Sequence, residues 1–257
     1  MAKTTASRYI IGNWKMYKTI EEALDFIDRI APKVTLGSTT VCLAVPFTAI
    51  KSLSEKAATL NVVIGAQNMN DASEGAFTGE VAARMLKDAG AKFVLLGHSE
   101  RRQYFHEGNE VLNRKVKRAL ESGLEPIVCV GETYEEYKND KTESVLREQI
   151  SQCLSGLDPK AISSIKIAYE PVWAIGTGLA MDPKTVSEKH NSIRGYVQEL
   201  FGSGSSSLQV LYGGSVNEKN AAEFLSQKGV DGLLVGSASL YPEVFAKIIE
   251  LSQNSAT

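Results

Sequence analysis

Eight short apolar segments recur along the chain, and they constrain its fold more than any other feature. They are rich in Val, Ile and Leu and alternate little between apolar and polar residues, which is typical of strands buried on both faces of a parallel sheet. We predict strands at residues 9–12, 40–45, 62–66, 93–96, 126–130, 165–168, 208–211 and 232–235.

Helical patterns separate these segments. Thr19-Ile20-Glu21-Glu22 matches a capping box, and apolar residues follow it at helical spacing. We expect further helices near residues 49–59, 79–89, 107–122, 136–154, 184–201, 217–227 and 242–252. Eight alternations of strand and helix favour one α/β domain over residues 1–257, a closed (β/α)8 barrel. An open doubly wound sheet is the alternative, but Gly176-Thr177-Gly178 has neither the spacing nor the position of a dinucleotide-binding loop.

The composition argues against several classes of partner. The chain has 257 residues and a formal net charge of −2 with no long basic run, so we expect no nucleic-acid partner. No apolar run is long enough to span a bilayer and the N-terminus lacks a signal pattern, so we expect no membrane partner and a cytoplasmic location. The three cysteines are far apart and lack the spacing of a zinc site or a disulfide framework.

In such barrels the catalytic groups lie just after the strands, at their carboxyl ends. Asn13-Trp14-Lys15 follow the first strand, and the Lys15 ammonium could bind an anion or a polarised oxygen rather than simply face solvent. Gly97-His98-Ser99-Glu100 follow the fourth strand. A helical turn that begins at Ser99 would disfavour a positive charge nearby, so His98 would stay neutral and donate a hydrogen bond. A purely structural His98 is the alternative.

Four other titratable residues are predicted to have no catalytic role. Cys42 and Cys129 lie inside apolar runs and are expected in the core. His190 falls on the apolar stripe of its helix and is expected to pack there, whereas His106 begins a polar segment and is expected to be solvated.

Glu170 lies where a strand meets a loop. The segment 165–168 leads through Tyr169 into this carboxylate, and a Pro-stiffened stretch with a Gly-flanked tip follows. A base at that junction would be held by a rigid strand, while the loop could close over substrate and exclude water. The same residues alone also suit a turn-capping Glu and an ordinary surface loop. The predicted flap consists of Pro171, Val172, Trp173, Ala174, Ile175, Gly176, Thr177 and Gly178.

Turns rich in Gly and Ser follow the last two strands. Those at 213–215 and 236–239 each open toward a helix, where backbone N–H groups can bind a phosphate. No cluster of His, Cys and Asp predicts a metal site and no nucleotide or flavin motif occurs, so we expect neither metal nor cofactor. Cofactor-free proton abstraction next to a carbonyl of a small phosphorylated substrate fits these residues best. A silent phosphate-binding barrel and a barrel enzyme for another phosphorylated sugar remain open at this point.

Five sequence blocks occur in a characteristic order. They are Gly-Asn-Trp-Lys-Met at 12–16, Gly-His-Ser-Glu-Arg-Arg at 97–102, Cys-Val-Gly-Glu at 129–132, Ala-Tyr-Glu-Pro-Val-Trp-Ala-Ile-Gly-Thr-Gly at 168–178 and Tyr-Gly-Gly-Ser at 212–215. With these blocks the chain resembles the triosephosphate isomerase family over essentially its whole length. The resemblance implies a cofactor-free TIM barrel that interconverts dihydroxyacetone phosphate and D-glyceraldehyde 3-phosphate, a step of glycolysis and gluconeogenesis.

The resemblance also implies roles for single residues. Glu170 would be the base, His98 would polarise the carbonyl as a neutral imidazole, and the loop after Glu170 would close, as described for this family. Lys15 and Asn13 would bind substrate, with Glu100 and Ser99 in support. The phosphate would be bound by the backbone N–H groups of Gly176, Ser215, Gly236 and Ser237.

Loop 67–80, with Thr78 and Glu80, resembles the arm that inserts into a second subunit near Asn13 and His98, which implies a homodimer. Two stretches depart from the family pattern. Gly236-Ser237 stands where Gly-Gly is common, and serine keeps the N–H but restricts φ. Leu179-Ala180-Met181 follows the flap where a Lys-Thr-Ala type is common, which could alter the closure rate but not the chemistry.

Overall fold

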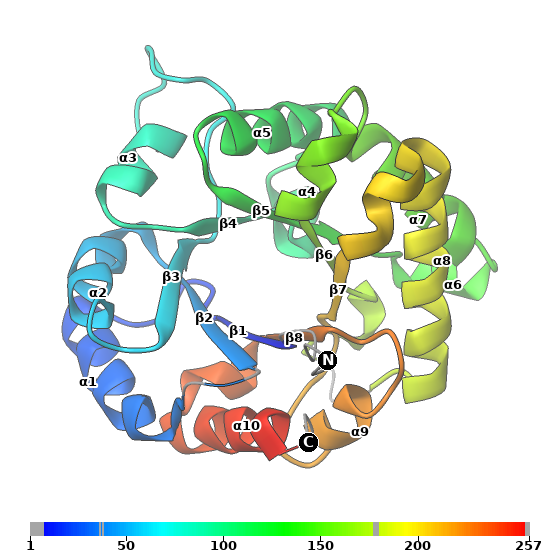
Figure 1. The fold of residues 1–257 in the computed structure, drawn as a ribbon. Helices are drawn as coiled ribbons and strands as arrows, with labels where there is room; N and C mark the ends of the chain where they lie inside the picture. The colour runs from blue at the N-terminus through cyan, green and yellow to red at the C-terminus, as the bar shows by residue number, and fades with distance from the viewer. Residues whose placement is uncertain (1–7, 36, 38, 177–179, 255–257) are drawn as a thin grey trace.

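The computed structural model describes residues 8–35, 37, 39–176 and 180–254, and these form a closed barrel of parallel strands (Figure 1). Neighbours pair in chain order, and the last strand closes the barrel by pairing with the first. The strands are β1 (Arg8–Asn13), β2 (Thr39–Val45), β3 (Val62–Ala66), β4 (Phe93–Leu96), β5 (Glu125–Val130), β6 (Lys166–Tyr169), β7 (Gln209–Tyr212) and β8 (Gly232–Val235). The predicted (β/α)8 barrel is confirmed, because every apolar segment forms a strand.

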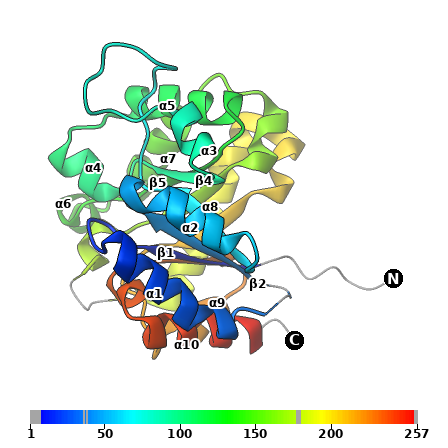
Figure 2. The ribbon, with the colours of Figure 1, turned by 90° about the vertical axis from the view of Figure 1, so that its left-hand side faces the viewer.

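Helices surround the barrel and cover its outer face (Figures 1 and 2). The α-helices are α1 (Ile20–Ile30), α2 (Ile50–Ala57), α3 (Ala83–Asp88), α4 (Ser99–Tyr104), α5 (Asn109–Glu121), α6 (Tyr134–Lys138), α7 (Thr142–Cys153), α8 (Pro183–Phe201), α9 (Ala221–Leu225) and α10 (Pro242–Asn254). Short 3₁₀ helices are η1 (Ala31–Lys33), η2 (Phe47–Ala49), η3 (Pro159–Ser164), η4 (Val172–Ala174), η5 (Gly202–Ser207) and η6 (Ser237–Leu240). None of the helices in the described ranges has the length and apolar character needed to cross a membrane.

Local sequence determines where the helices begin and break. The predicted capping box at α1 forms: Glu22 N–H donates to Thr19 Oγ1 at 3.3 Å, and Thr19 N–H donates to Glu22 Oε2 at 2.7 Å. The single helix predicted at 136–154 is wrong, because α6 and α7 are separate. Asp140 between them has a φ of 53°, a left-handed conformation that an α-helix cannot contain.

The core consists of two layers. The larger one lies between the strands and the surrounding helices, and its members include Ile10, Trp14 and Phe26. The smaller one contains side chains from the strands, such as Ile11 and Leu211, and includes both Cys42 and Cys129. The prediction that these two cysteines are core residues is confirmed. Strands packed in this way are rigid and can position side chains at their ends.

The segment 67–80 between β3 and α3, drawn in cyan, projects from one side of the barrel (Figures 1 and 2). Its tip is exposed, and the Phe77 side chain is 52% accessible. Phe77 is therefore a large apolar side chain that is exposed to solvent on a projecting loop, which is typical of a surface that contacts a partner.

Candidate active site

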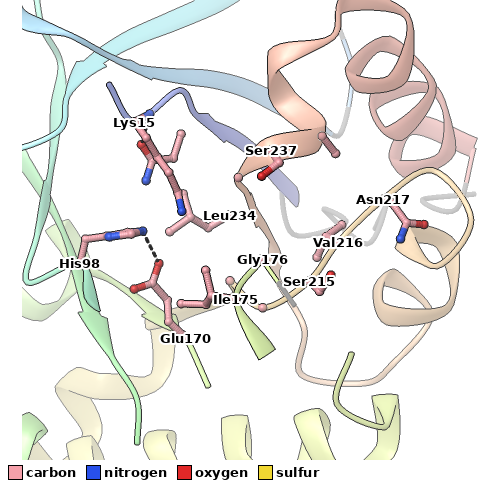
Figure 3. Close-up of a pocket in the computed structure, with 15 residues that line it drawn as sticks. Lys15, His98, Glu170, Ile175, Gly176, Ser215, Val216, Asn217, Leu234 and Ser237 are labelled. Carbon is pink, nitrogen blue, oxygen red and sulfur yellow. Dashed lines mark hydrogen bonds and ion pairs between the residues drawn. The ribbon is translucent and has the colours of Figure 1, made fainter. Parts of the chain in front are cut away.

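A cavity of about 260 Å³ opens at the carboxyl ends of the strands (Figure 3). Side chains from β1, β4 and β6 meet there with the turns that follow β7 and β8. The structure brings together the predicted residues Asn13, Lys15, His98, Glu170, Gly176, Ser215, Gly236 and Ser237 in the wall of this one cavity. These residues are up to 224 positions apart in the chain (237 − 13), so only the closed barrel makes them neighbours.

Glu170 follows the end of β6 and is 2% exposed. Its N–H donates to Val130 O at 2.7 Å, which continues the sheet pairing with β5 by one residue. The Oε1 atom lies 3.3 Å from His98 Nε2, and Oε2 accepts a hydrogen bond from Ser99 N–H at 3.3 Å. A nearly buried carboxylate held by such long contacts is available to accept a proton from a ligand.

Two glycines make room for Glu170, one beside its backbone and one beside its side chain. A Cβ on Gly131 would lie 1.8 Å from Glu170 O, and a Cβ on Gly213 would lie 2.8 Å from Glu170 Cγ. Gln149 on α7 holds Gly131 from the other side, accepting from its N–H at 2.8 Å and donating to its carbonyl at 3.1 Å. The sequence blocks contained both glycines, but Gln149 was missed because its contact with β5 leaves no local pattern.

His98 is the N-cap of α4, whose first residue is Ser99 as expected. The Nδ1 atom accepts a hydrogen bond from Glu100 N–H at 3.3 Å, so that nitrogen carries no proton. The remaining proton of a neutral imidazole is then on Nε2, which faces Glu170 and the cavity. In that tautomer the imidazole directs its N–H at the Glu170 carboxylate and the cavity.

Lys15 has a strained backbone, with a φ of 52°. Two side chains hold it: Asn13 Oδ1 accepts from Lys15 N–H at 3.0 Å, and Gln67 Nε2 donates to Lys15 O at 2.8 Å. The ammonium group contacts Glu100 Oε1 at 2.7 Å. Gln67 was missed, although it directly follows β3 and the rule that placed the other groups would have found it.

The last two turns form the opposite wall (Figure 3). Gly236 has φ −83° and ψ −114°, and Ser237 begins η6, so neither residue needs the left-handed region. The restriction of φ that serine imposes is therefore no obstacle at this position. Ser239 braces the turn, because its hydroxyl donates to Gly236 O at 2.7 Å and its carbonyl accepts from Trp14 Nε1 at 3.1 Å.

The first part of the flap is anchored on Glu132, which is fully buried. Glu132 Oε1 accepts from Trp173 Nε1 at 2.9 Å, the Tyr169 hydroxyl donates to the same carboxylate, and Glu132 O accepts from Val172 N–H at 3.0 Å. Burial raises the pKa of the Glu132 carboxyl, because a charge there is poorly solvated. The Cys-Val-Gly-Glu block contained Glu132, but nothing in the sequence predicted that it holds the flap.

Ile175 and Gly176 of the flap reach the wall of the cavity, and Ala174 is buried behind them. The predicted flap residues Thr177 and Gly178, and Leu179 of the hinge, lie outside the described residues. Within the described ranges no group of three or more His, Cys, Asp or Glu could hold a metal ion.

Burial, together with the nearby Glu170 carboxylate, raises the pKa of the Cys129 thiol well above its usual value.

The two predicted interface residues lie away from this cavity. Thr78 and Glu80 are exposed on the projecting loop, where Glu80 Oε2 accepts from Asn70 Nδ2 at 2.9 Å. A second hollow of about 280 Å³ adjoins the active-site cavity and includes Asn13 and His98 in its wall. The loop of the same chain does not contribute Thr78 or Glu80 to either hollow.

Comparisons with known proteins agree with this architecture. The sequence model of the family "Triosephosphate isomerase" matches residues 8–252. Triosephosphate isomerase of Protochlamydia amoebophila (strain UWE25) is 51% identical over 93% of this chain and 91% of its own length, and that of Alkaliphilus metalliredigens (strain QYMF) is 44% identical over 93% and 97%. The crystal structure of triosephosphate isomerase from Bartonella henselae superposes with a TM-score of 0.86 at 36% identity, covering 95% of this chain and 98% of that one. The chain therefore belongs to the triosephosphate isomerase family.

Proposed function

We propose that this chain interconverts dihydroxyacetone phosphate and D-glyceraldehyde 3-phosphate, with Glu170 as the base and His98 and Lys15 as its electrophilic partners. The observation that carries the assignment is the convergence of these three side chains on one cavity of about 260 Å³. That volume suits a small ligand. A carboxylate, an uncharged N–H donor and an ammonium are the groups that proton abstraction next to a carbonyl requires.

The reaction begins when Glu170 takes a proton from C1 of dihydroxyacetone phosphate. The electrons of the C–H bond form a C1–C2 double bond, and the carbonyl oxygen receives the Nε2 proton of His98, which gives an enediol. His98 Nε2 then takes the proton of the C1 hydroxyl, Glu170 returns its proton to C2, and the aldehyde forms at C1. Protons and electrons balance without a cofactor.

Lys15 stabilises the negative charge that develops on the substrate oxygen. Its side chain is 21% exposed and its ammonium is held by Glu100, so the charge is oriented before substrate binds. The strained Lys15 backbone is held by the Asn13 and Gln67 side chains, which keeps the ammonium directed at the cavity. Asn13 and Gln67 therefore act as positioning residues in this proposal.

The phosphate is bound on the far wall, by the backbone N–H groups of Gly176, Ser215, Gly236 and Ser237. All four residues line the cavity that contains Glu170. Backbone N–H groups in Gly- and Ser-rich turns bind anions without an additional positive charge. The flap that carries Gly176 then covers the phosphate and excludes water from the enediol.

We also propose that the chain is a cytoplasmic homodimer with one domain per subunit. The second hollow contains exposed apolar side chains, including Met16 at 95% and Phe105 at 63% accessibility, next to Asn13 and His98. Loop 67–80 carries Phe77, which is 52% exposed, and is the segment that would fill the hollow of a second copy. Covering these apolar surfaces would favour association.

The dimer is tested by sedimentation of the purified protein and of a Phe77→Asp variant. The proposal expects a mass of two chains for the unaltered protein. The variant should dissociate and lose activity, because a charge in an apolar contact is costly. A monomeric, fully active unaltered protein would contradict the dimer.

The enzymatic assignment is tested with a coupled assay for either triose phosphate. The expected result is reversible conversion without added metal or cofactor, and much weaker activity with longer sugar phosphates. Tight binding of the triose phosphates without turnover would instead indicate a catalytically silent binding barrel. Preference for a longer sugar phosphate would show that the substrate is a different phosphorylated sugar.

A further inference from the structure

Two serines in the turn after β8 have different environments. Ser239 is fully buried, and its hydroxyl donates to Gly236 O. Ser237, two residues earlier, lies in the wall of the active-site cavity, and its hydroxyl has no hydrogen-bond partner in the part of the chain that the structure describes. Ser239 therefore maintains the turn, and the Ser237 hydroxyl takes no part in holding it.

The turn that carries Ser237 is held in place by hydrogen bonds and close packing. Ser239 N–H donates to Gly236 O at 2.8 Å, and the Ser239 carbonyl accepts from the buried Trp14 indole at 3.1 Å. On the inner side, a Cβ on Gly12 would lie 3.0 Å from Ser239 Cβ, so β1 packs closely against the turn. A hydroxyl at the start of this braced turn loses little freedom when it binds a ligand.

The surroundings of the Ser237 hydroxyl suit an anion. Figure 3 shows Ser237 in the wall formed by the last two turns, with its oxygen turned toward the side of the cavity on which Lys15 lies. A Cβ on the adjacent Gly236 would lie 3.7 Å from Lys15 Cε, so the stem of Lys15 runs beside this turn. Ser215, from the turn after β7, lies in the same wall.

We propose that the Ser237 hydroxyl donates a hydrogen bond to a phosphate oxygen of the substrate, in addition to the donation from its backbone N–H. The inference rests on the proposed function and refines it, because it makes one side chain a determinant of affinity for the phosphate group. A phosphate oxygen is a charged acceptor, and hydrogen bonds to charged groups are stronger than those between neutral groups. The Ser237 side chain is exposed to solvent before substrate binds, which reduces the net gain.

The test compares Ser237→Ala, Ser237→Gly and Ser237→Thr with the unaltered enzyme. Each is assayed with D-glyceraldehyde 3-phosphate, with unphosphorylated D-glyceraldehyde, and with inorganic phosphate as a competitive inhibitor. The Ala and Gly variants should raise KM for the phosphorylated substrate and Ki for phosphate by about 10-fold. Their kcat/KM for D-glyceraldehyde should change by less than about twofold, because that substrate has no phosphate for the hydroxyl to contact.

The Thr variant keeps a hydroxyl and should remain within about threefold of the unaltered enzyme in both KM and Ki. Ser226→Ala is the matched control, since its hydroxyl bonds Glu223 O on the surface of α9, far from the cavity, and it should change nothing.

Three results would overturn the inference. An Ala variant with unchanged KM and Ki would show that the hydroxyl makes no useful hydrogen bond to the phosphate. A Gly variant close to the unaltered enzyme, with only Ala impaired, would assign the effect to the Cβ and backbone. An equal loss with D-glyceraldehyde would indicate a distorted site. Absence of isomerisation by the unaltered enzyme would be a different result, since it would reject the proposed function itself.

Discussion

The two ends of the barrel use similar residues for opposite purposes. At the carboxyl end, Lys15, His98 and Glu170 are directed into a cavity and keep donor or acceptor capacity for a ligand. At the amino end, Lys166 is 3% exposed, but its ammonium is bonded to Glu125 Oε1 at 2.5 Å and lies 4.2 Å from the centre of the Tyr9 ring.

A second pair at the amino end repeats the pattern. Arg194 on α8 is bonded to Asp231 Oδ2, and that carboxylate oxygen also accepts from Val210 N–H at 2.8 Å. In both pairs the opposite charges are bonded to each other and do not line the active-site cavity. The difference teaches that burial of a charged group does not by itself mark a catalytic site; direction into a shared cavity does.

The largest expected effect comes from the carboxyl end. Glu170→Gln keeps the shape of the side chain but cannot accept the substrate proton, so kcat should fall by at least ~10²–10⁴-fold. The thermal unfolding temperature should barely change, because the carboxylate makes only long contacts. Near-normal turnover would show that Glu170 is not the base. It would also contradict the proposal that only the charged residues at the carboxyl end act in catalysis.

The amino end should show the reverse behaviour. Lys166→Met removes the ammonium but keeps most of the buried stem, and it should lower the free energy of unfolding by about 1–3 kcal/mol, since Glu125 is partly solvated and loses only part of its stabilisation. The kcat should stay within about twofold. Chemical denaturation measures the first quantity and the coupled assay the second, with Lys160→Met on the surface as control. A large loss of kcat in the folded variant would show that the ends are not independent.

The buried imidazole of His190, on α8, should have a smaller effect, which concerns how the free energy of unfolding depends on pH. His190 is fully buried, as expected from its place on α8; its Nδ1 lies 3.0 Å from Gly229 O, and Nε2 has no partner among the described residues. Burial lowers the pKa of His190 from 6.5 to about 3. Below pH 6.5 the unfolded chain therefore binds a proton that the folded chain does not, so the free energy of unfolding falls as the pH falls toward 3.

At pH 5 the loss from His190 should be about 2 kcal/mol relative to neutral pH, and the contribution should be constant above pH 7. Denaturation of the unaltered protein and of His190→Gln at several pH values tests this, because other titrating groups cancel in the difference between the two curves. Parallel curves between pH 7 and pH 5 would contradict the proposed cause.

The sequence predicted the barrel and most of the site, for identifiable physical reasons. The strands are buried on both faces and so appear as apolar runs, and the proposed catalytic residues Lys15, His98 and Glu170 follow strand ends within two residues. Contacts made across the fold were not predictable in this way. Gln149 acts from the outer layer and Glu132 holds the flap from β5, and neither role leaves a periodic signal.

Two expectations from the sequence failed because of the backbone conformation. The helix predicted at 136–154 was wrong because hydrophobic spacing does not reveal the left-handed Asp140. The φ restriction expected of Ser237 proved irrelevant, because η6 begins there with an ordinary backbone. In both cases the deciding quantity is one dihedral angle, which a residue's chemistry constrains only weakly.

The central claim is that Glu170 moves a carbon-bound proton of the triose at the carboxyl end of the barrel. Its most direct test is deuterium incorporation at C1 of dihydroxyacetone phosphate in D₂O, followed by proton NMR for the unaltered enzyme, Lys166→Met and Glu170→Gln. The account predicts incorporation at similar rates by the first two, and a rate for Glu170→Gln that falls by the same factor as its turnover. Undiminished incorporation by Glu170→Gln would contradict it.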